Sequence, residues 1–423
     1  MIEKYNFHWR EGFLYNFPKK REIFNKLIDE IKTRQIISLT GIRRTGKSVL
    51  LKQIIDYLIS VEKVKRENIL FYSFDEEQPK IDDIIKEYES KTAKDILKEN
   101  TKIYIFLDEI QKLENWQNQI KYYYDNYSNI KFFVSGSSSL FIKKKTRESL
   151  AGRIYEFTLY PLSFREFLIF RDKEEFIEKP SMFENLLKGE FLAYLKRQFI
   201  EIVNETEERV GEYLRTLVEK IVYQDIPKVF PIENEDLLMK IIKIISSDPG
   251  MILDYKSLSN ELGISRVTLS NYFFYLEESF LIRKLYNFSK NNLTSEKKMK
   301  KFYLSSTSLF TFLNNSVEES KLIENLIVVN TGASFFWRTP QKYEVDIVLA
   351  KGNEIIPIEI KYRNNILPKE VKNLIHFSKD FKIQKAVMIT KDFSGVNNFK
   401  LENDKILEIN FIPAWEFLLN YKF

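Results

Sequence analysis

The sequence predicts an α/β protein that begins with a parallel sheet, and three observations lead to this fold class. The short apolar run 35–40 precedes a glycine-containing turn at 41–48, and residues 49–55 continue with apolar positions at helical spacing. Another apolar strand, 103–107, ends in two acids, and a further one, 131–135, ends in a serine-rich turn. Polar residues that follow parallel strands face the crevice where α/β sheets bind their ligands.

The turn at 41–48 reads Gly-Ile-Arg-Arg-Thr-Gly-Lys-Ser and matches the phosphate-binding loop, or P-loop. Its glycines allow successive N–H groups to point at an anion, and the helix that begins at Lys47 adds its positive end. We expect Lys47 to reach the β- and γ-phosphates and Ser48 Oγ to bind Mg²⁺. The alternative is a chance glycine turn before a helix. The residues expected around the nucleotide are Gly41, Ile42, Arg43, Arg44, Thr45, Gly46, Lys47 and Ser48.

The acids Asp108 and Glu109 complete the pattern of a nucleotide site, because they end an apolar strand downstream of the loop. Asp108 is expected to hold Mg²⁺, usually through water, and Glu109 to orient or deprotonate the attacking water. The alternative is a buried strand that leaves the core through two acids. Glu109 matters most, because it distinguishes a hydrolase from a switch that is operated by nucleotide.

Serines follow the strand at 131–135, and either Ser137 or Ser138 is a candidate sensor of the γ-phosphate. An equally good interpretation is a helix cap, for which serine is a favoured residue.

Composition excludes several kinds of chemistry. The chain has 423 residues, no cysteine, and only His8 and His376 as histidines. Disulfides, thiolate nucleophiles and cysteine-bound zinc are therefore excluded, and histidine-based triads and metal sites are disfavoured. The net charge of +6 permits contact with nucleic acid without requiring it. No apolar run approaches the ~18 residues of a membrane span. The N-terminus has no leader pattern, so we expect a cytoplasmic protein without membrane contact.

The middle of the chain is predicted to be helical. Residues 163–247 have apolar positions three and four apart, which indicates a helical lid after the sheet domain. Residues 248–304 have the pattern of a winged helix, with Ser265 as the cap of its second helix. That helix offers Arg266 and Asn271 to base edges but ends in two glutamates, which would repel phosphate. DNA and protein therefore remain equal candidates for its partner.

The last segment, 305–423, contains a second set of candidate catalytic residues. Alternation along two strands places Asp346 on one face of the first, and Glu359 with Lys361 on one face of the second. A hairpin would bring them together, so that two carboxylates hold Mg²⁺ while the lysine polarises an attacking water. The set resembles the PD-(D/E)XK nuclease-type core, with Glu324 as a candidate fourth member. The alternatives are an inactive relic and a surface salt bridge.

Several motifs in combination resemble a prokaryotic AAA+-type ATPase family that usually carries a winged-helix and nuclease-like C-terminal domain. These motifs are 41–48, 107–111 with Trp116, 135–139, 150–153 and 160–167. The resemblance implies a five-stranded parallel sheet and ATP as the nucleotide. It also implies an arginine, Arg147 or Arg153, that acts on a neighbouring subunit's nucleotide in a homo-oligomer. A structural salt bridge is the alternative for Arg153. Ser305 and Ser306 depart from the family pattern, which has an acid shortly after the strand at 301–304.

We therefore expect an ATP-binding protein that hydrolyses ATP with Mg²⁺ and couples hydrolysis to DNA or another nucleic acid through its C-terminal module. The alternative function is a nucleotide-gated protein-interaction switch with an inactive nuclease-like domain. The expected domains are a P-loop ATPase core at 1–162, a helical lid at 163–247, a winged helix at 248–304 and a PD-(D/E)XK-like domain at 305–423.

Overall fold

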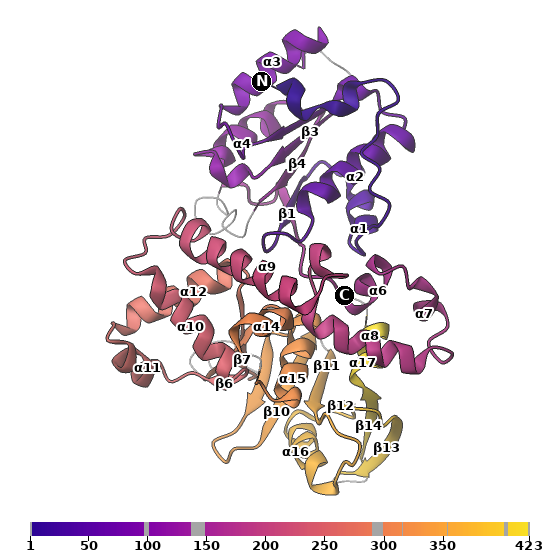
Figure 1. Cartoon of the computed structure of the whole chain (residues 1–423), viewed down its shortest axis with the longest axis vertical. Helices are drawn as coiled ribbons and strands as arrows, with labels where there is room; N and C mark the ends of the chain where they lie inside the picture. Colours follow the sequence, from indigo (N-terminus) through magenta and orange to yellow (C-terminus); the bar gives the residue numbers. More distant parts are fainter. Residues whose placement is uncertain are drawn as a thin grey trace. The chain divides into compact units, whose positions relative to one another are not determined.

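The computed structural model describes residues 2–96, 101–136, 149–289, 299–314, 316–352, 354–401 and 405–421 (Figure 1). The chain divides into two compact units, Met1–Pro161 and Leu162–Phe423. Among the described residues, we find no helix with both the length and the apolar character needed to cross a bilayer.

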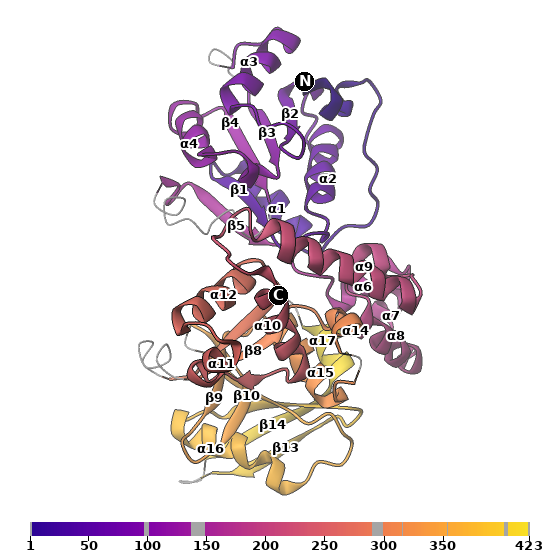
Figure 2. The ribbon, with the colours of Figure 1, turned by 60° about the vertical axis from the view of Figure 1, so that its left-hand side comes forward.

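The first unit is a five-stranded sheet in the order β2-β3-β4-β1-β5, and every pair of neighbours is parallel. Its strands are β1 (Ile36–Thr40), β2 (Ile69–Ser73), β3 (Ile103–Asp108), β4 (Ile130–Ser135) and β5 (Ile154–Thr158). Its helices are α1 (Phe24–Asp29), α2 (Lys47–Ser60), α3 (Ile81–Thr92) and α4 (Trp116–Asn126). One apolar core joins the sheet to α1 and α2, and a second joins it to α3 and α4 (Figure 2). This architecture confirms the predicted α/β fold with a parallel sheet.

The N-terminal segment covers the outer edge of β2 with side-chain hydrogen bonds. The Asn6 amide both donates to and accepts from the Phe71 backbone, at 2.9 and 2.7 Å. His8 Nε2 and Trp9 Nε1 lie 3.0 and 2.8 Å from the carbonyl oxygen of Ile69. These contacts satisfy backbone groups that an edge strand would otherwise expose. Burial is the main reason that the pKa of His8 falls to about 4.

The second unit contains a mixed nine-stranded sheet in the order β13-β14-β12-β11-β10-β9-β7-β8-β6. Its strands are β6 (Met251–Ile252), β7 (Ile282–Asn287), β8 (Lys300–Leu304), β9 (Phe335–Arg338), β10 (Glu344–Lys351), β11 (Glu354–Ile360), β12 (Lys385–Thr390), β13 (Gly395–Lys400) and β14 (Ile406–Pro413). Its helices are α6 (Phe164–Phe170), α7 (Glu174–Glu178), α8 (Glu184–Lys196), α9 (Glu207–Lys220), α10 (Glu235–Ser247), α11 (Tyr255–Leu262), α12 (Arg266–Glu278), α14 (Phe310–Leu313), α15 (Glu319–Asn330), α16 (Lys372–Phe381) and α17 (Ala414–Asn420).

Three segments that we expected as separate domains share this second unit. β7 pairs in parallel with β9, so the strands of the expected wing continue into the sheet of the C-terminal segment. Helices α6 and α8, from the expected lid, share one apolar core with α15, α17 and that sheet. The helix-turn-helix pattern coincides with α11 and α12, and Ser265 Oγ accepts the backbone N–H of Thr268 as expected of a cap.

Candidate functional site

The P-loop connects β1 to α2, and two glycines determine its backbone path. Gly41 has φ 142°, and a side chain there would clash with the carbonyl oxygen of Leu159. Gly46 has φ 92° and immediately precedes Lys47, the first residue of α2. Left-handed conformations of this kind favour glycine. The spacing of the two glycines therefore fixes the loop immediately before a helix N-terminus, where an anion is stabilised.

The Lys47 side chain folds back along this loop. Its Nζ donates to the carbonyl oxygens of Gly41 and Ile42, at 2.9 and 3.0 Å, and the side chain is buried. A phosphate oxygen is a stronger acceptor for an ammonium than a carbonyl, so Nζ can exchange these contacts for a nucleotide. Arg43 is half-buried, and Arg44 is exposed with φ 70°. Lys47 is therefore the positively charged side chain of the loop that lies against the loop backbone, where a phosphate would bind.

Arg21 supports the loop through hydrogen bonds to backbone carbonyl oxygens, and it was not among the predicted site residues. Its Nη1 donates to the carbonyl oxygen of Thr45 at 2.7 Å, and its Nη2 donates to that of Tyr160 at 2.8 Å. The Thr45 hydroxyl in turn donates to the Ile42 carbonyl oxygen at 2.9 Å. Arg21 lies in a segment without a motif, so only the folded contacts reveal this role.

Asp108 ends β3 beside the loop, and two serines hold it. Ser48 Oγ donates to Asp108 Oδ2 at 2.6 Å, and Ser135 Oγ donates to Asp108 Oδ1. Hydroxyl and carboxylate oxygens are the ligands that Mg²⁺ prefers, so Ser48 and Asp108 fit a magnesium ion that also binds phosphate. Ser135 ends the adjacent strand β4 and was not among the predicted site residues. Its position at the carboxyl end of a parallel strand was the available signal.

Glu109 follows directly but lies in a different environment. Its φ of 54° turns the chain out of the strand, and Gln111 Nε2 donates to Glu109 Oε2 at 2.6 Å. Burial raises the pKa of Glu109, and Asp108 adds to this effect while Lys47 opposes it. A raised pKa favours a carboxylate that accepts a proton during reaction.

The other predicted nucleotide contacts differ in what the structure describes of them. Ser137 and Ser138, together with Arg147, lie outside the described residues. Arg153 forms two hydrogen bonds with Asp125, from Nε at 2.7 Å and Nη2 at 3.1 Å, on the surface of the first unit. This ion pair matches the structural alternative that we considered for Arg153. It leaves the guanidinium at the surface.

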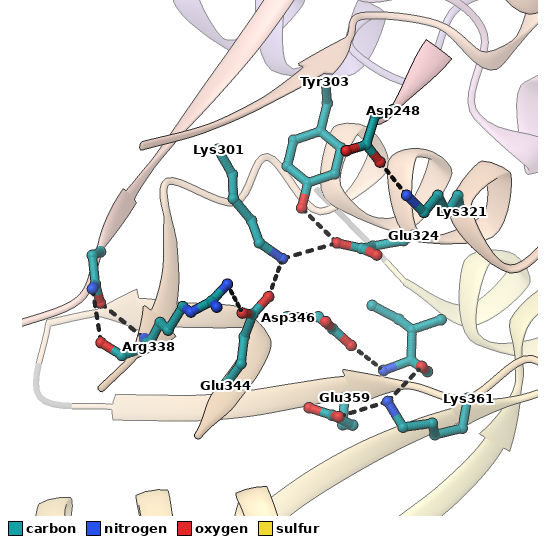
Figure 3. A network of polar contacts seen from close by, with 12 residues as sticks. Asp248, Lys301, Tyr303, Lys321, Glu324, Arg338, Glu344, Asp346, Glu359 and Lys361 are labelled. Carbon is teal, nitrogen blue, oxygen red and sulfur yellow. Dashed lines mark hydrogen bonds and ion pairs between the residues drawn. The ribbon is translucent and has the colours of Figure 1, made fainter. Parts of the chain in front are cut away.

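The C-terminal carboxylates come together as the alternation predicted. β10 and β11 are antiparallel, and the register that pairs Ile347 with Ile358 places Asp346 opposite Glu359. Asp346 Oδ2 accepts the backbone N–H of Ile360 at 2.8 Å, and Lys361 Nζ donates to Glu359 Oε1 at 2.7 Å (Figure 3). Burial raises the pKa of both carboxyl groups, and their mutual repulsion raises that of Glu359 further. A divalent cation would relieve this repulsion, so the pair fits Mg²⁺.

Further charged groups adjoin this pair. Glu324, on α15, accepts from Tyr303 Oη at 2.6 Å and from Lys301 Nζ at 3.2 Å. Lys301 Nζ also lies 2.6 Å from Glu344 Oε1, and Arg338 Nη1 donates to Glu344 Oε2 at 2.9 Å. Burial opposes the charge of Lys301, but Glu324 and the other acids outweigh it and hold its pKa well above the usual range. In the described parts of the chain, no three Asp, Glu or His side chains lie close enough to enclose a metal by themselves.

Comparison with protein families divides the chain into three matches. Residues 33–168 match a model described as an AAA domain. Residues 200–320 and 316–415 match two models described as domains of unknown function, DUF8612 and DUF4143.

Three similar proteins come from two organisms, and two of them match over most of both chains. An uncharacterised protein of Methanocaldococcus jannaschii is 26% identical over 95% of this chain and 92% of its own length. A second from that organism is 31% identical over 71% of this chain and 65% of its own. An uncharacterised protein of Haemophilus influenzae is 25% identical over 86% of this chain and 91% of its own.

Similar solved structures are more distant. The Aeropyrum pernix ORC2 protein, solved as ADPNP–ADP complexes, is 12% identical over 73% of this chain and 96% of its own, with a TM-score of 0.39. The ORC1 protein of that organism, solved with DNA, is 13% identical over 74% and 96%, with a TM-score of 0.31. Similarity at this level carries no functional argument. The AAA-domain match over residues 33–168, together with the P-loop geometry, supports an ATP-binding function of the AAA+ type.

Proposed function

We propose that this protein hydrolyses ATP with Mg²⁺ at the P-loop. The observation that carries the proposal is the convergence of Lys47, Ser48, Asp108 and Glu109 at one edge of the parallel sheet. Mg²⁺, held by Ser48 and Asp108, would neutralise charge on the phosphates. Each protein group then has a distinct task that its contacts already suggest.

In this mechanism, Lys47 leaves the loop carbonyls and pairs with the β- and γ-phosphates. Glu109 orients a water molecule in line with the γ-phosphorus and accepts its proton. The water oxygen forms the new bond to phosphorus as the bond to the bridging oxygen breaks, which yields ADP and phosphate. Arg153 is our candidate for a finger toward a neighbouring subunit, which requires that its pair with Asp125 opens.

The proposal is tested by comparing nucleotide binding with turnover. Glu109→Gln keeps the size of the side chain but removes the base, so we expect normal ATP affinity and a turnover about a hundredfold or more lower. Lys47→Ala should weaken ATP binding itself. Turnover that is unchanged in Glu109→Gln would show that another residue positions the water.

We infer that the second unit couples hydrolysis to nucleic acid, and that Asp346, Glu359 and Lys361 are its candidate phosphodiester site. The support is the pair of opposed carboxylates, Glu359 buried and Asp346 half-buried, with a lysine beside them. Full-length protein should cleave DNA or RNA in the presence of Mg²⁺, and Glu359→Ala should lose this activity while it retains ATP turnover. Protein that hydrolyses ATP but neither binds nor cuts nucleic acid would refute the coupling.

One observation favours a second candidate, the nucleotide-gated protein-interaction switch. The exposed side of α12 carries Val267 and Phe274, which are 71% and 42% exposed, beside Arg266 and Asn271. Large apolar side chains on the helix that would read DNA suit a protein partner better than a groove. ATP turnover that DNA stimulates, and that Arg266→Ala and Asn271→Ala abolish, would decide for nucleic acid.

A further inference from the structure

Lys301 is a buried cation within the carboxylate site of the second unit. It lies on β8, the strand of the expected wing, and only 5% of its side chain is exposed. Its Nζ approaches Glu344 Oε1 at 2.6 Å and Glu324 Oε1 at 3.2 Å (Figure 3). A lysine is almost never fully buried unless it is paired, and this one is paired twice.

The two carboxylates that Lys301 binds each accept a hydrogen bond from a second donor as well. Tyr303 Oη donates to Glu324, from the same face of β8 as Lys301. Arg338 donates to the second oxygen of Glu344. These contacts compensate the charge of both glutamates without any metal. The contacts of Glu324 are therefore those of an ion-paired structural group and not those of a carboxylate that is available to bind a metal ion.

Asp346 and Glu359 differ from these glutamates. Glu359 is 2% exposed, and its Oε2 is buried without a hydrogen bond of normal geometry among the described residues, although the Asn373 amide lies near the carboxylate. Its other oxygen meets Lys361, and Asp346 lies opposite on β10. A buried carboxylate oxygen without a donor is costly unless a cation or water satisfies it. The unsatisfied acceptor of this site thus lies on the Asp346 side and not on the Glu324 side.

We propose that the Lys301 ammonium pairs with Glu324 and Glu344 and so prevents these carboxylates from binding a divalent metal. The metal would then be bound by Asp346 and Glu359 alone. This inference rests on the proposed metal site at those two residues. A metal ion and an ammonium group compete for the same carboxylate, because two positive charges that bind one carboxylate lie close together and repel each other strongly in a buried site. Removing the Lys301 charge frees Glu324 as a third oxygen ligand. Affinity for a hard divalent cation rises with the number of charged ligands.

The test is a titration of the full-length protein with Mn²⁺, followed by electron paramagnetic resonance and calorimetry without nucleotide. Asp108→Asn is present in every variant, so that the P-loop site does not contribute. Lys301→Met keeps the length of the side chain and should bind Mn²⁺ at least about tenfold more tightly. Adding Glu324→Gln to it should return the affinity to the starting value.

Lys300→Met is the matched control. Lys300 precedes Lys301 on β8, points to the opposite face, and lies 5.4 Å from the Tyr286 ring. The substitution Lys300→Met removes the same charge from the same strand, so the Mn²⁺ affinity should stay within about twofold of that of the protein with Lys300. Equal tightening by the two variants would overturn the inference, because it would show a long-range charge effect.

Two further variants separate this inference from the proposed site, and both should leave the fold intact. Glu359→Gln should abolish Mn²⁺ binding at the C-terminal site; binding that is unchanged refutes the site itself. Glu324→Gln alone should change the Mn²⁺ affinity by less than about threefold, because Glu324 is already ion-paired with Lys301 and does not bind the metal. A loss of about tenfold in Glu324→Gln would make Glu324 a metal ligand beside Lys301 and overturn the inference, even if Lys301→Met does not fold.

Discussion

Acid should destabilise the first unit through His8. This histidine is fully buried against the edge of β2, and its pKa is lowered to about 4, chiefly by burial, with Arg66 adding to the effect. An unfolded histidine has a pKa of about 6.5, so the unfolded chain binds the proton more readily than the native one. The stabilisation is therefore complete above pH 6.5 and declines as the pH falls toward 4. Between pH 7 and pH 4.5 the loss is on the order of 2 kcal/mol.

Hydrogen exchange of peptides from β2, followed by mass spectrometry, reports the opening free energy of this unit separately from the second one. His8→Gln should be less stable at pH 7, because packing is lost, but its stability should depend less on pH. The difference between the two proteins should shrink toward pH 4.5. His376→Gln removes a histidine of the second unit, so hydrogen exchange of the β2 peptides in the first unit should keep the pH dependence of the native protein. Parallel curves for the native protein and His8→Gln would refute the role of His8.

Three further predictions concern the nucleotide site. Gly41→Ala should abolish ATP binding, because a methyl group at this position would clash with the carbonyl oxygen of Leu159. Isothermal titration calorimetry would detect the loss of binding. Ser135→Ala should raise the Mg²⁺ concentration needed for half-maximal turnover several-fold, because Asp108 loses one of its two hydroxyl donors. Arg153→Ala should lower turnover at least about tenfold more than Asp125→Ala if the arginine acts as a finger. Equal effects in a steady-state ATPase assay would identify a structural ion pair.

Residues close together in the chain made the P-loop and the acids of β3 predictable. Gly41, Lys47 and Ser48 are fixed by one turn, and Asp108 and Glu109 follow one apolar strand, so sequence spacing alone carries the geometry. Strand alternation similarly placed Asp346 and Glu359 on facing positions of a hairpin.

Contacts between distant segments were beyond reach of the sequence. Arg21 reaches Tyr160 across 139 residues, and no pattern at either end announces the contact. Lys301 stands in a lysine-rich stretch that suggests a solvated surface, yet β8 turns it inward onto acids from α15 and β10. The parallel pairing of β7 with β9 joins segments about 50 residues apart, and neither strand carries a pattern that predicts the other as its partner.

The two consecutive acids of the nucleotide site show how backbone geometry assigns chemistry. Asp108 is still in extended strand, and both of its oxygens accept hydroxyl groups, from Ser48 and Ser135. Glu109 has a left-handed φ of 54°, a conformation that costs roughly 1 kcal/mol or more for such a residue and that turns its carboxylate toward Gln111. Strain at a single residue thus separates two adjacent carboxylates into unlike surroundings. One remains among hydroxyl donors that suit a metal ligand, and the other is half-buried, with a raised pKa that suits a proton acceptor.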